Sequence, residues 1–138
     1  MDEARLAALY KARFPRQELP RKNAIWQVLC RHFFQHYVRP ADTVVDLACG
    51  YGEFINNIDA GQKVAVDLNP DTREFLASDV RFEQADATAI GNLLQGRADV
   101  VFTSNFLEHL PDKTALELLL GQVLAALKPG GRFLVMGP

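Results

Sequence analysis

The chain has 138 residues, of which 49% are hydrophobic and 23% charged, and its formal net charge is −2. These values are ordinary for a soluble globular protein, and the length supports one domain with a sizeable core. No apolar run is as long as a membrane span, and the acidic start Met1-Asp2-Glu3 differs from a basic secretory signal. The two cysteines, Cys30 and Cys49, have neither a metal-binding spacing nor a disulfide pattern. We therefore expect a cytoplasmic protein with no membrane partner.

The first forty residues are basic, in contrast to the rest of the chain. Residues 1–40 carry eight Lys or Arg residues against three acidic ones, so their charge is +5 and the remainder carries −7. One interpretation is a solvated helix face, and the other is a surface that attracts an anionic substrate. Basic and aromatic residues do not interleave, and no repeat is present, so a nucleic-acid partner is not expected.

The same segment predicts two helices. We expect a short helix over residues 2–13, a loop from Pro15 to Pro20, and a longer helix from Arg21 to Val38. Apolar residues recur every three or four positions along the longer helix, which predicts a wide stripe that packs in the core rather than a substrate platform. This stripe comprises Ile25, Trp26, Leu29, Cys30, Phe33, Phe34, Tyr37 and Val38.

The segment from Val44 to Phe54 combines a buried strand, a tight turn and the start of a helix expected over residues 51–58. Small residues alternate in the turn, in the spacing Asp46-x-Ala48-x-Gly50-x-Gly52, so that a ligand can approach the backbone. The following helix directs its free N–H groups and positive dipole end to the same place. A dinucleotide-binding turn needs a third glycine where this chain has Ile55, which argues against an oxidoreductase.

The next strand, Lys63 to Val66, ends in Asp67. Ligands of parallel nucleotide-binding sheets lie beyond the carboxyl ends of the strands, and a carboxylate there can accept hydrogen bonds from both ribose hydroxyls. Asp67 follows Gly50 by 17 residues, close to the roughly 20 expected for a ribose-binding acid. The alternative role of Asp67 is a cap before Pro70, which Asn69 can fill instead.

The remaining elements continue the alternation of helix and strand. We expect a helix over 70–77, a strand over 80–83 running into Asp86-Ala87, a poor helix or loop over 91–96 and a strand over 98–103. Asp112 then caps a helix, a turn lies over 128–131, and a fifth strand covers 132–136. The buried stripe expected on that last helix comprises Leu116, Leu119, Leu120, Val123, Leu124 and Leu127.

Residues 43–138 resemble the class I S-adenosylmethionine-dependent methyltransferases. The glycine turn, strand-end Asp67, the pair Asp86-Ala87, the segment Leu107 to Pro111 and the turn Leu127 to Gly131 follow one another in the family's order. Ala48 departs from the family, which more often has glycine there. The resemblance implies an α/β fold, a three-layer αβα Rossmann-like parallel sheet of strand order 3-2-1-4-5 over residues 41–138, with the N-terminal helical arm of residues 1–40 beside it.

The resemblance also implies a cofactor, S-adenosylmethionine, whose product is S-adenosylhomocysteine. Asp46 is expected near the methionine end of the cofactor, and Asp86 and Ala87 at the adenine. Asn105 and Phe106 are expected to face the transferred methyl group and the substrate. The full set of expected cofactor-binding residues is Asp46, Ala48, Cys49, Gly50, Gly52, Asp67, Leu68, Asp86, Ala87, Asn105 and Phe106.

Full members of this family continue after the fifth strand with another helix and two strands, whereas this chain stops at Pro138. The fifth strand is then an open, apolar sheet edge, which is an aggregation liability. We expect a fragment of a longer enzyme, or a partner, such as a second copy in a homodimer, that covers this edge.

The function expected is methyl transfer to a small-molecule acceptor, with oxygen as the methylated atom. His109 and Asn105 are the candidate catalytic residues, since a histidine can remove the proton of an acceptor hydroxyl; the alternative for His109 is a structural role at a helix start. Glu108 with His109 resembles a metal-binding pair of some methyltransferases, but no further ligands are evident, so no metal is expected. The alternatives are a nucleic-acid methyltransferase and a cofactor-binding module without catalysis.

Overall fold

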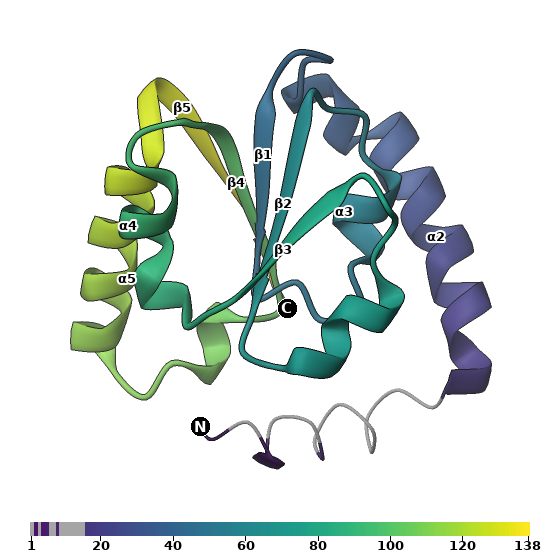
Figure 1. Cartoon of the computed structure of the whole chain (residues 1–138), viewed down its shortest axis with the longest axis horizontal. Coiled ribbons are helices and arrows are strands. Elements are labelled where there is room, and N and C mark those ends of the chain that lie inside the picture. The colour runs from purple at the N-terminus through teal and green to yellow at the C-terminus, as the bar shows by residue number, and fades with distance from the viewer. Residues whose placement is uncertain (1, 3, 6–7, 9–15) are drawn as a thin grey trace.

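The computed structural model describes residues 2, 4–5, 8 and 16–138. The short helix expected over residues 2–13 falls mostly outside this part. The described residues form a parallel sheet in the order β3-β2-β1-β4-β5, with α2 and α3 on one face and α4 and α5 on the other (Figure 1). The strands are β1 (Thr43–Leu47), β2 (Gln62–Asp67), β3 (Val80–Gln84), β4 (Ala98–Ser104) and β5 (Leu127–Met136). The expected three-layer fold and strand order are confirmed.

Four α-helices and several 3-10 turns connect these strands in the described part of the chain. The helices are α2 (Leu19–His32), α3 (Glu53–Asn57), α4 (Ile90–Leu94) and α5 (Lys113–Ala126). The 3-10 turns are η1 (Arg16–Glu18), η2 (Phe34–Tyr37), η3 (Pro70–Phe75), η4 (Ala87–Ala89) and η5 (Leu107–His109). None of the helices in the described ranges is long and apolar enough to cross a membrane.

The central strand β1 lies between β2 and β4, and its register fixes the geometry of the sheet. Val45 is paired with Val64 on one side and with Val101 on the other. All pairs are parallel, so the carboxyl ends of the strands lie at one edge of the sheet. Residues 44–47 are buried, as expected for a strand covered on both faces.

The core consists of one apolar layer on each face of the sheet. On the side of α2 and α3, the rings of Phe34 and Phe54 pack on Phe102, with centroid distances of 5.1 and 3.7 Å. Cys30 and Val38 are buried in the same layer. The layer under α4 and α5 is aliphatic and contains Val45, Leu47, Val64, Val66, Ile90, Leu94, Val101, Leu119 and Val123. The core role expected for the aromatic helix is thus confirmed for its buried members.

Two predicted boundaries near the N-terminus are wrong. The loop expected from Pro15 to Pro20 contains the start of α2, because a proline is tolerated in the first helical turn, where its missing N–H has no partner to lose. The helix expected to reach Val38 ends at His32 and continues as η2 after a break at Phe33. The stripe also turns partly to solvent, since Ile25, Phe33 and Tyr37 are 52%, 53% and 40% exposed.

Further along the chain, the predicted helices 51–58 and 70–77 are shorter than expected. The first is α3, and the second is the 3-10 turn η3. The residues expected as a poor helix over 91–96 largely form α4. The turn expected over 128–131 lies within β5, as a bulge between the pairs Ala98–Leu127 and Val100–Arg132.

The stripe of α5 is narrower than predicted. Leu119, Val123 and Ala126 are buried, whereas Leu120 and Leu124 are 43% and 75% exposed. Successive helical positions are about 100° apart, so residues 120 and 124 lie beside the stripe rather than in it. Counting leucines in a leucine-rich helix therefore overestimates its buried face.

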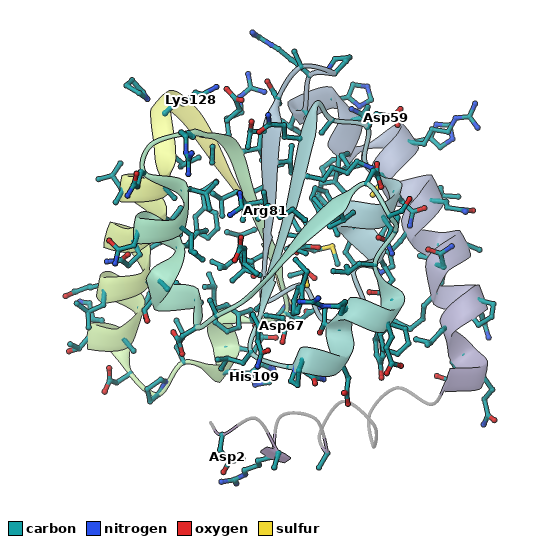
Figure 2. The ribbon with its side chains drawn as sticks, viewed as in Figure 1. Asp2, Asp59, Asp67, Arg81, His109 and Lys128 are labelled. Atoms are coloured by element: carbon teal, nitrogen blue, oxygen red, sulfur yellow. The ribbon has the colours of Figure 1, made fainter. Side chains whose placement is uncertain are left out.

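A single carboxylate joins three strands at the amino end of the sheet. Oδ2 of Asp99 in β4 accepts the backbone N–H of Thr43 at the start of β1, at 2.8 Å. The same oxygen accepts a hydrogen bond from Nζ of Lys128 in β5, at 3.1 Å. Figure 2 shows Lys128 at the end of the molecule opposite to Asp67 and His109.

Candidate functional site

A cavity of about 610 Å³ lies at the carboxyl ends of the strands, and its wall includes Asp67 from β2 and His109 from η5 (Figure 2). Most of the predicted site residues meet there, although they come from four separate segments of the chain. The predicted residues that line the cavity are Ala48, Cys49, Gly50, Asp67, Leu68, Asp86, Ala87, Asn105, Phe106 and His109. This volume is within the range of small-molecule sites.

The glycine turn presents its backbone to the cavity through an unusual conformation. Ala48, Gly50 and Gly52 have φ angles of 55°, 57° and 72°, so alternate residues are left-handed. Glycine adopts this conformation without steric cost, but alanine does not. The backbone N–H of Cys49 donates a hydrogen bond of 3.1 Å to the carbonyl of Val66, which fixes the turn against β2. A strained residue therefore lies in the cavity wall, at the position where the chain departs from its resembled family.

The carboxylate of Asp67 is hydrogen-bonded to the backbone of the glycine turn. Its Oδ2 accepts the N–H of Gly50 at 2.8 Å, and its Oδ1 accepts the N–H of Asn69 at 2.9 Å. The residue is 3% exposed. Burial raises the pKa of Asp67 above its ordinary value, although the hydrogen bonds from Asn69 and Gly50 oppose this. Asn69 caps η3 through the N–H of Asp71, so Asp67 is not needed as that cap.

The pair Asp86-Ala87 lies at the end of β3, on the same cavity wall as Leu68. Asp86 caps η4, because its Oδ1 accepts the N–H and the hydroxyl of Thr88 at 2.8 and 2.7 Å. Its side chain is exposed. These bonds fix the carboxylate and leave its Oδ2 lone pairs for an exocyclic amine.

Two of the predicted residues lie behind the cavity wall rather than in it. Asp46 is 3% exposed and accepts the backbone N–H of Ile55. Burial raises the pKa of Asp46 well above its ordinary value, and the charge of Glu53 is the second largest cause of this rise. Gly52 is buried at the start of α3, where a Cβ would come within 2.5 Å of Cδ2 of Leu76. Both support the turn from behind, and direct contact of either with a ligand stays a prediction.

The residues after β4 form a second wall. Asn105 has a left-handed φ of 49°, which asparagine tolerates better than most residues, and its N–H bonds the carbonyl of Met136 at 2.9 Å. His109 ends η5, is exposed, and donates its backbone N–H to the carbonyl of Phe106 at 3.0 Å. A side chain able to exchange a proton therefore faces the same cavity as the glycine turn.

Cys49 also lies in the wall, but its thiol is not reactive. The residue is 8% exposed. Burial, and next the charges of Asp46 and Asp67, raise the pKa of the Cys49 thiol well above its ordinary value. The thiol therefore stays protonated and acts as a small apolar side chain. Among the residues that the structure describes, no group of three or more His, Cys, Asp or Glu is placed to hold a metal ion.

Sequence reasoning missed the part of the wall that α2 and the start of α3 supply. Lys22 and Trp26 of α2, with Tyr51 and Glu53, line the cavity. Trp26 also stacks on Phe34 in the core, at a centroid distance of 6.2 Å. Two signals pointed to this segment, the basic composition of the first forty residues and the apolar stripe that includes Trp26, but the stripe was assigned to the core rather than to a substrate platform.

The match to known families agrees with this geometry. A family model described as a methyltransferase domain matches residues 45–135. The chain belongs to this family. The family assignment made from the motifs, to the class I Rossmann-like methyltransferases, is confirmed, and S-adenosylmethionine is the cofactor that this family uses.

Individual proteins of this family are similar to the chain over most of its length. The ribosomal protein L11 methyltransferase of Symbiobacterium thermophilum is 28% identical, over 79% of this chain and 36% of the relative. A solved SAM-dependent methyltransferase of Archaeoglobus fulgidus is 26% identical with a TM-score of 0.65, over 80% of this chain and 51% of that one. An O-methyltransferase family protein of Burkholderia thailandensis is 25% identical with a TM-score of 0.63, over 87% of this chain and 37% of that one. The chain thus spans about a third of the length of the curated relatives it matches.

Proposed function

We propose that the chain carries the cofactor-binding part of an S-adenosylmethionine-dependent methyltransferase that acts on oxygen of a small-molecule acceptor. The observation that carries this proposal is the buried carboxylate of Asp67 at the end of β2, hydrogen-bonded to Gly50 of the left-handed turn. A carboxylate, an open backbone and a further acid at the end of β3 are the groups that an adenosine needs.

The residues of the wall fit S-adenosylmethionine from the adenine to the sulfur. The Asp67 carboxylate accepts the backbone N–H groups of Gly50, Asn69 and Leu68, and a carboxylate has about four acceptor sites, so it keeps capacity for a ribose hydroxyl. Asp86 accepts from the adenine amine, and the N–H of Ala87 meets the ring. The turn at Ala48 and Gly50 keeps side-chain bulk away from the thioether. When bound, this cofactor supplies an electrophilic methyl group on a sulfonium.

The work of the protein is to position the acceptor and accept its proton. Asn105 and Phe106 orient the acceptor at the end of β4. His109, in the same wall, takes the proton of the acceptor hydroxyl. Met136, whose carbonyl accepts the N–H of Asn105, adds an apolar side chain to this part of the cavity wall. Holding the two reactants in line accounts for a large part of the rate in such reactions.

The name of one relative indicates a second class of acceptor, a protein. The L11 methyltransferase is named for a ribosomal protein, and the basic first forty residues of this chain have +5 charge, which favours an acidic macromolecular partner. We prefer the small acceptor because Trp26 and Leu29, two half-buried residues of α2, give the cavity an apolar side.

Calorimetric titration with S-adenosylhomocysteine tests the cofactor site. Saturable binding to the wild-type chain is expected, with about a 10- to 100-fold loss in Asp67→Asn, because charge-assisted hydrogen bonds are each worth about 1.5–3 kcal/mol. Asp71→Asn is the matched control, since Asp71 is exposed and does not line the cavity. NAD is the control ligand. A folded wild-type chain that binds neither S-adenosylhomocysteine nor S-adenosylmethionine would refute the proposal.

Transfer of a labelled methyl group from S-adenosylmethionine tests the acceptor. The chain is incubated in parallel with a set of small phenols and alcohols and with ribosomal protein L11. Label on a hydroxyl compound, reduced in His109→Gln at neutral pH, is the expected result. Label on L11 alone would replace the small acceptor with a protein.

A further inference from the structure

The cavity wall contains an ion pair that neither the motifs nor the family match assign. Nζ of Lys22 in α2 lies 3.3 Å from Oε1 of Glu53, the first residue of α3. Both residues line the cavity, and their side chains are 27% and 13% exposed. The ammonium also lies 5.8 Å from the ring centroid of Tyr51, on the glycine turn. A charge of each sign thus faces the ligand space beside the turn.

Glu53 is under-satisfied in this position. Its Oε1 is buried and accepts no hydrogen bond from the described residues, although it lies within ion-pair distance of Lys22. A carboxylate has about four acceptor sites, and burying one without donors is costly. Glu53 also raises the pKa of the neighbouring Asp46, so a further positive group near it would relieve repulsion between the two acids. The wall therefore favours a ligand that brings a cationic donor to Glu53.

The position of the pair along the cavity indicates which part of a ligand it meets. Asp86 lies at the end of β3, Asp67 at the end of β2, and the glycine turn at the end of β1. An adenosine held by Asp86 and Asp67 extends its 5′ side over the turn, away from β3. The glycine turn leads directly into α3, and α2 and α3 cover one face of the sheet (Figure 1). Lys22 and Glu53 thus line the cavity beside the turn, next to the 5′ side of such a nucleoside.

We propose that Glu53 and Lys22 together bind the α-ammonium and α-carboxylate of the amino-acid end of the cofactor. The inference rests on the proposed function and assigns this end to side chains of α2 and α3, in place of Asp46, which lies behind the wall. In the free protein the two charges satisfy each other. When the amino acid binds, Glu53 pairs with its ammonium and Lys22 pairs with its carboxylate, in place of pairing with each other. No charge is then left buried and unpaired.

The arrangement also ties α2 to the ligand. Lys22 lies 31 positions before Glu53 in the chain, on a helix that packs on the core through Cys30. A bound carboxylate on Lys22 therefore links this helix to the glycine turn through the ligand. A ligand that lacks the amino acid makes no such link.

Comparing S-adenosylhomocysteine with 5′-methylthioadenosine, which has the nucleoside thioether but no amino acid, tests the assignment. Glu53→Gln and Lys22→Met are each expected to weaken S-adenosylhomocysteine about 10- to 100-fold in calorimetry, with the affinity for 5′-methylthioadenosine unchanged. Glu117→Gln and Lys113→Met on α5, outside the cavity wall, are matched controls. In hydrogen exchange, S-adenosylhomocysteine protects the amides of α2 in the wild-type chain and 5′-methylthioadenosine does not.

The outcomes separate this inference from the proposed function. Unchanged affinity for S-adenosylhomocysteine in both variants overturns the inference and leaves the cofactor site intact. An equal loss for both ligands also overturns it, since the substitutions then act on the nucleoside part of the site. If the folded wild-type chain binds neither ligand, the proposed function itself fails. Selective loss of the amino-acid ligand in both variants supports the assignment.

Discussion

Ala48 is the most informative position for a stability measurement, because it holds an alanine in a left-handed conformation with φ of 55°. A non-glycine residue in this region costs about 1–2 kcal/mol. Replacing it with glycine removes that cost but adds about 0.5–1 kcal/mol of unfolded-state entropy to be lost on folding. The strain removed is larger than the added entropy cost. We therefore expect Ala48→Gly to stabilise the chain by the difference, about 0.5–1 kcal/mol.

Thermal and urea unfolding of the ligand-free chain measure this change. For a domain of this size, about 1 kcal/mol corresponds to a rise of about 3 °C in Tm. Gln95→Gly is a second test of the same physics outside the cavity wall, since Gln95 is exposed and has φ of 46° after α4. Ala77→Gly is the opposite control, because Ala77 is exposed and has no positive φ.

Both glycine variants at positive φ should thus be more stable than wild type, and Ala77→Gly less stable. A loss of stability in Ala48→Gly as large as that in Ala77→Gly would refute the assignment of strain to the turn. Stabilisation of Gln95→Gly alone would mean that packing of the Ala48 methyl outweighs its backbone cost.

Three further predictions concern the support of the site. Gly52→Ala is expected to destabilise the chain by about 1–2 kcal/mol in urea unfolding, because its φ is 72° and the new Cβ meets Leu76; an unchanged midpoint would show that the turn rearranges freely. The raised pKa of Asp46 means that this carboxyl stabilises the fold when protonated, below its unfolded value of 3.8, and loses that contribution as pH rises through the folded pKa. Urea midpoints should therefore fall more steeply with rising pH in wild type than in Asp46→Asn, and parallel profiles would contradict this. Thr103→Val removes the buried hydrogen bond from Oγ1 to the carbonyl of Leu47, at 2.8 Å, and should cost about 1 kcal/mol; a rise in Tm would show that this bond adds no net stability.

The sheet could be predicted because its signals are local. The apolar runs at Val44 and Val64 form buried strands, of which the first leads into the glycine turn and the second ends in Asp67 at the ligand edge. The strands followed from these runs and their order from the family resemblance, whereas the helix ends could not be predicted. Local sequence does not record that Pro20 fits a first helical turn, or that Leu124 falls beside the buried face of α5.

The predicted site divides in the same way. Asp67 was identified because it ends a strand and Asp86 because it matches the family's motif order, and both line the cavity. Asp46 has the same local pattern but points into the interior, which depends on the neighbouring Ile55. The pair of Lys22 and Glu53 could not be predicted, since only the packing of α2 on the sheet brings these residues together.

The hydrogen bonds of Asp99 have a consequence for how this protein can change over evolutionary time. They join Thr43 of β1 and Lys128 of β5 to β4 at the end of the sheet remote from the cavity. Strand register is therefore anchored independently of the loops that follow the strands. The residues proposed to meet the acceptor, Asn105, Phe106 and His109, lie between β4 and the cap of α5, where substitutions leave these anchoring bonds untouched. This segment is the natural place to introduce sequence diversity when selecting for new acceptors.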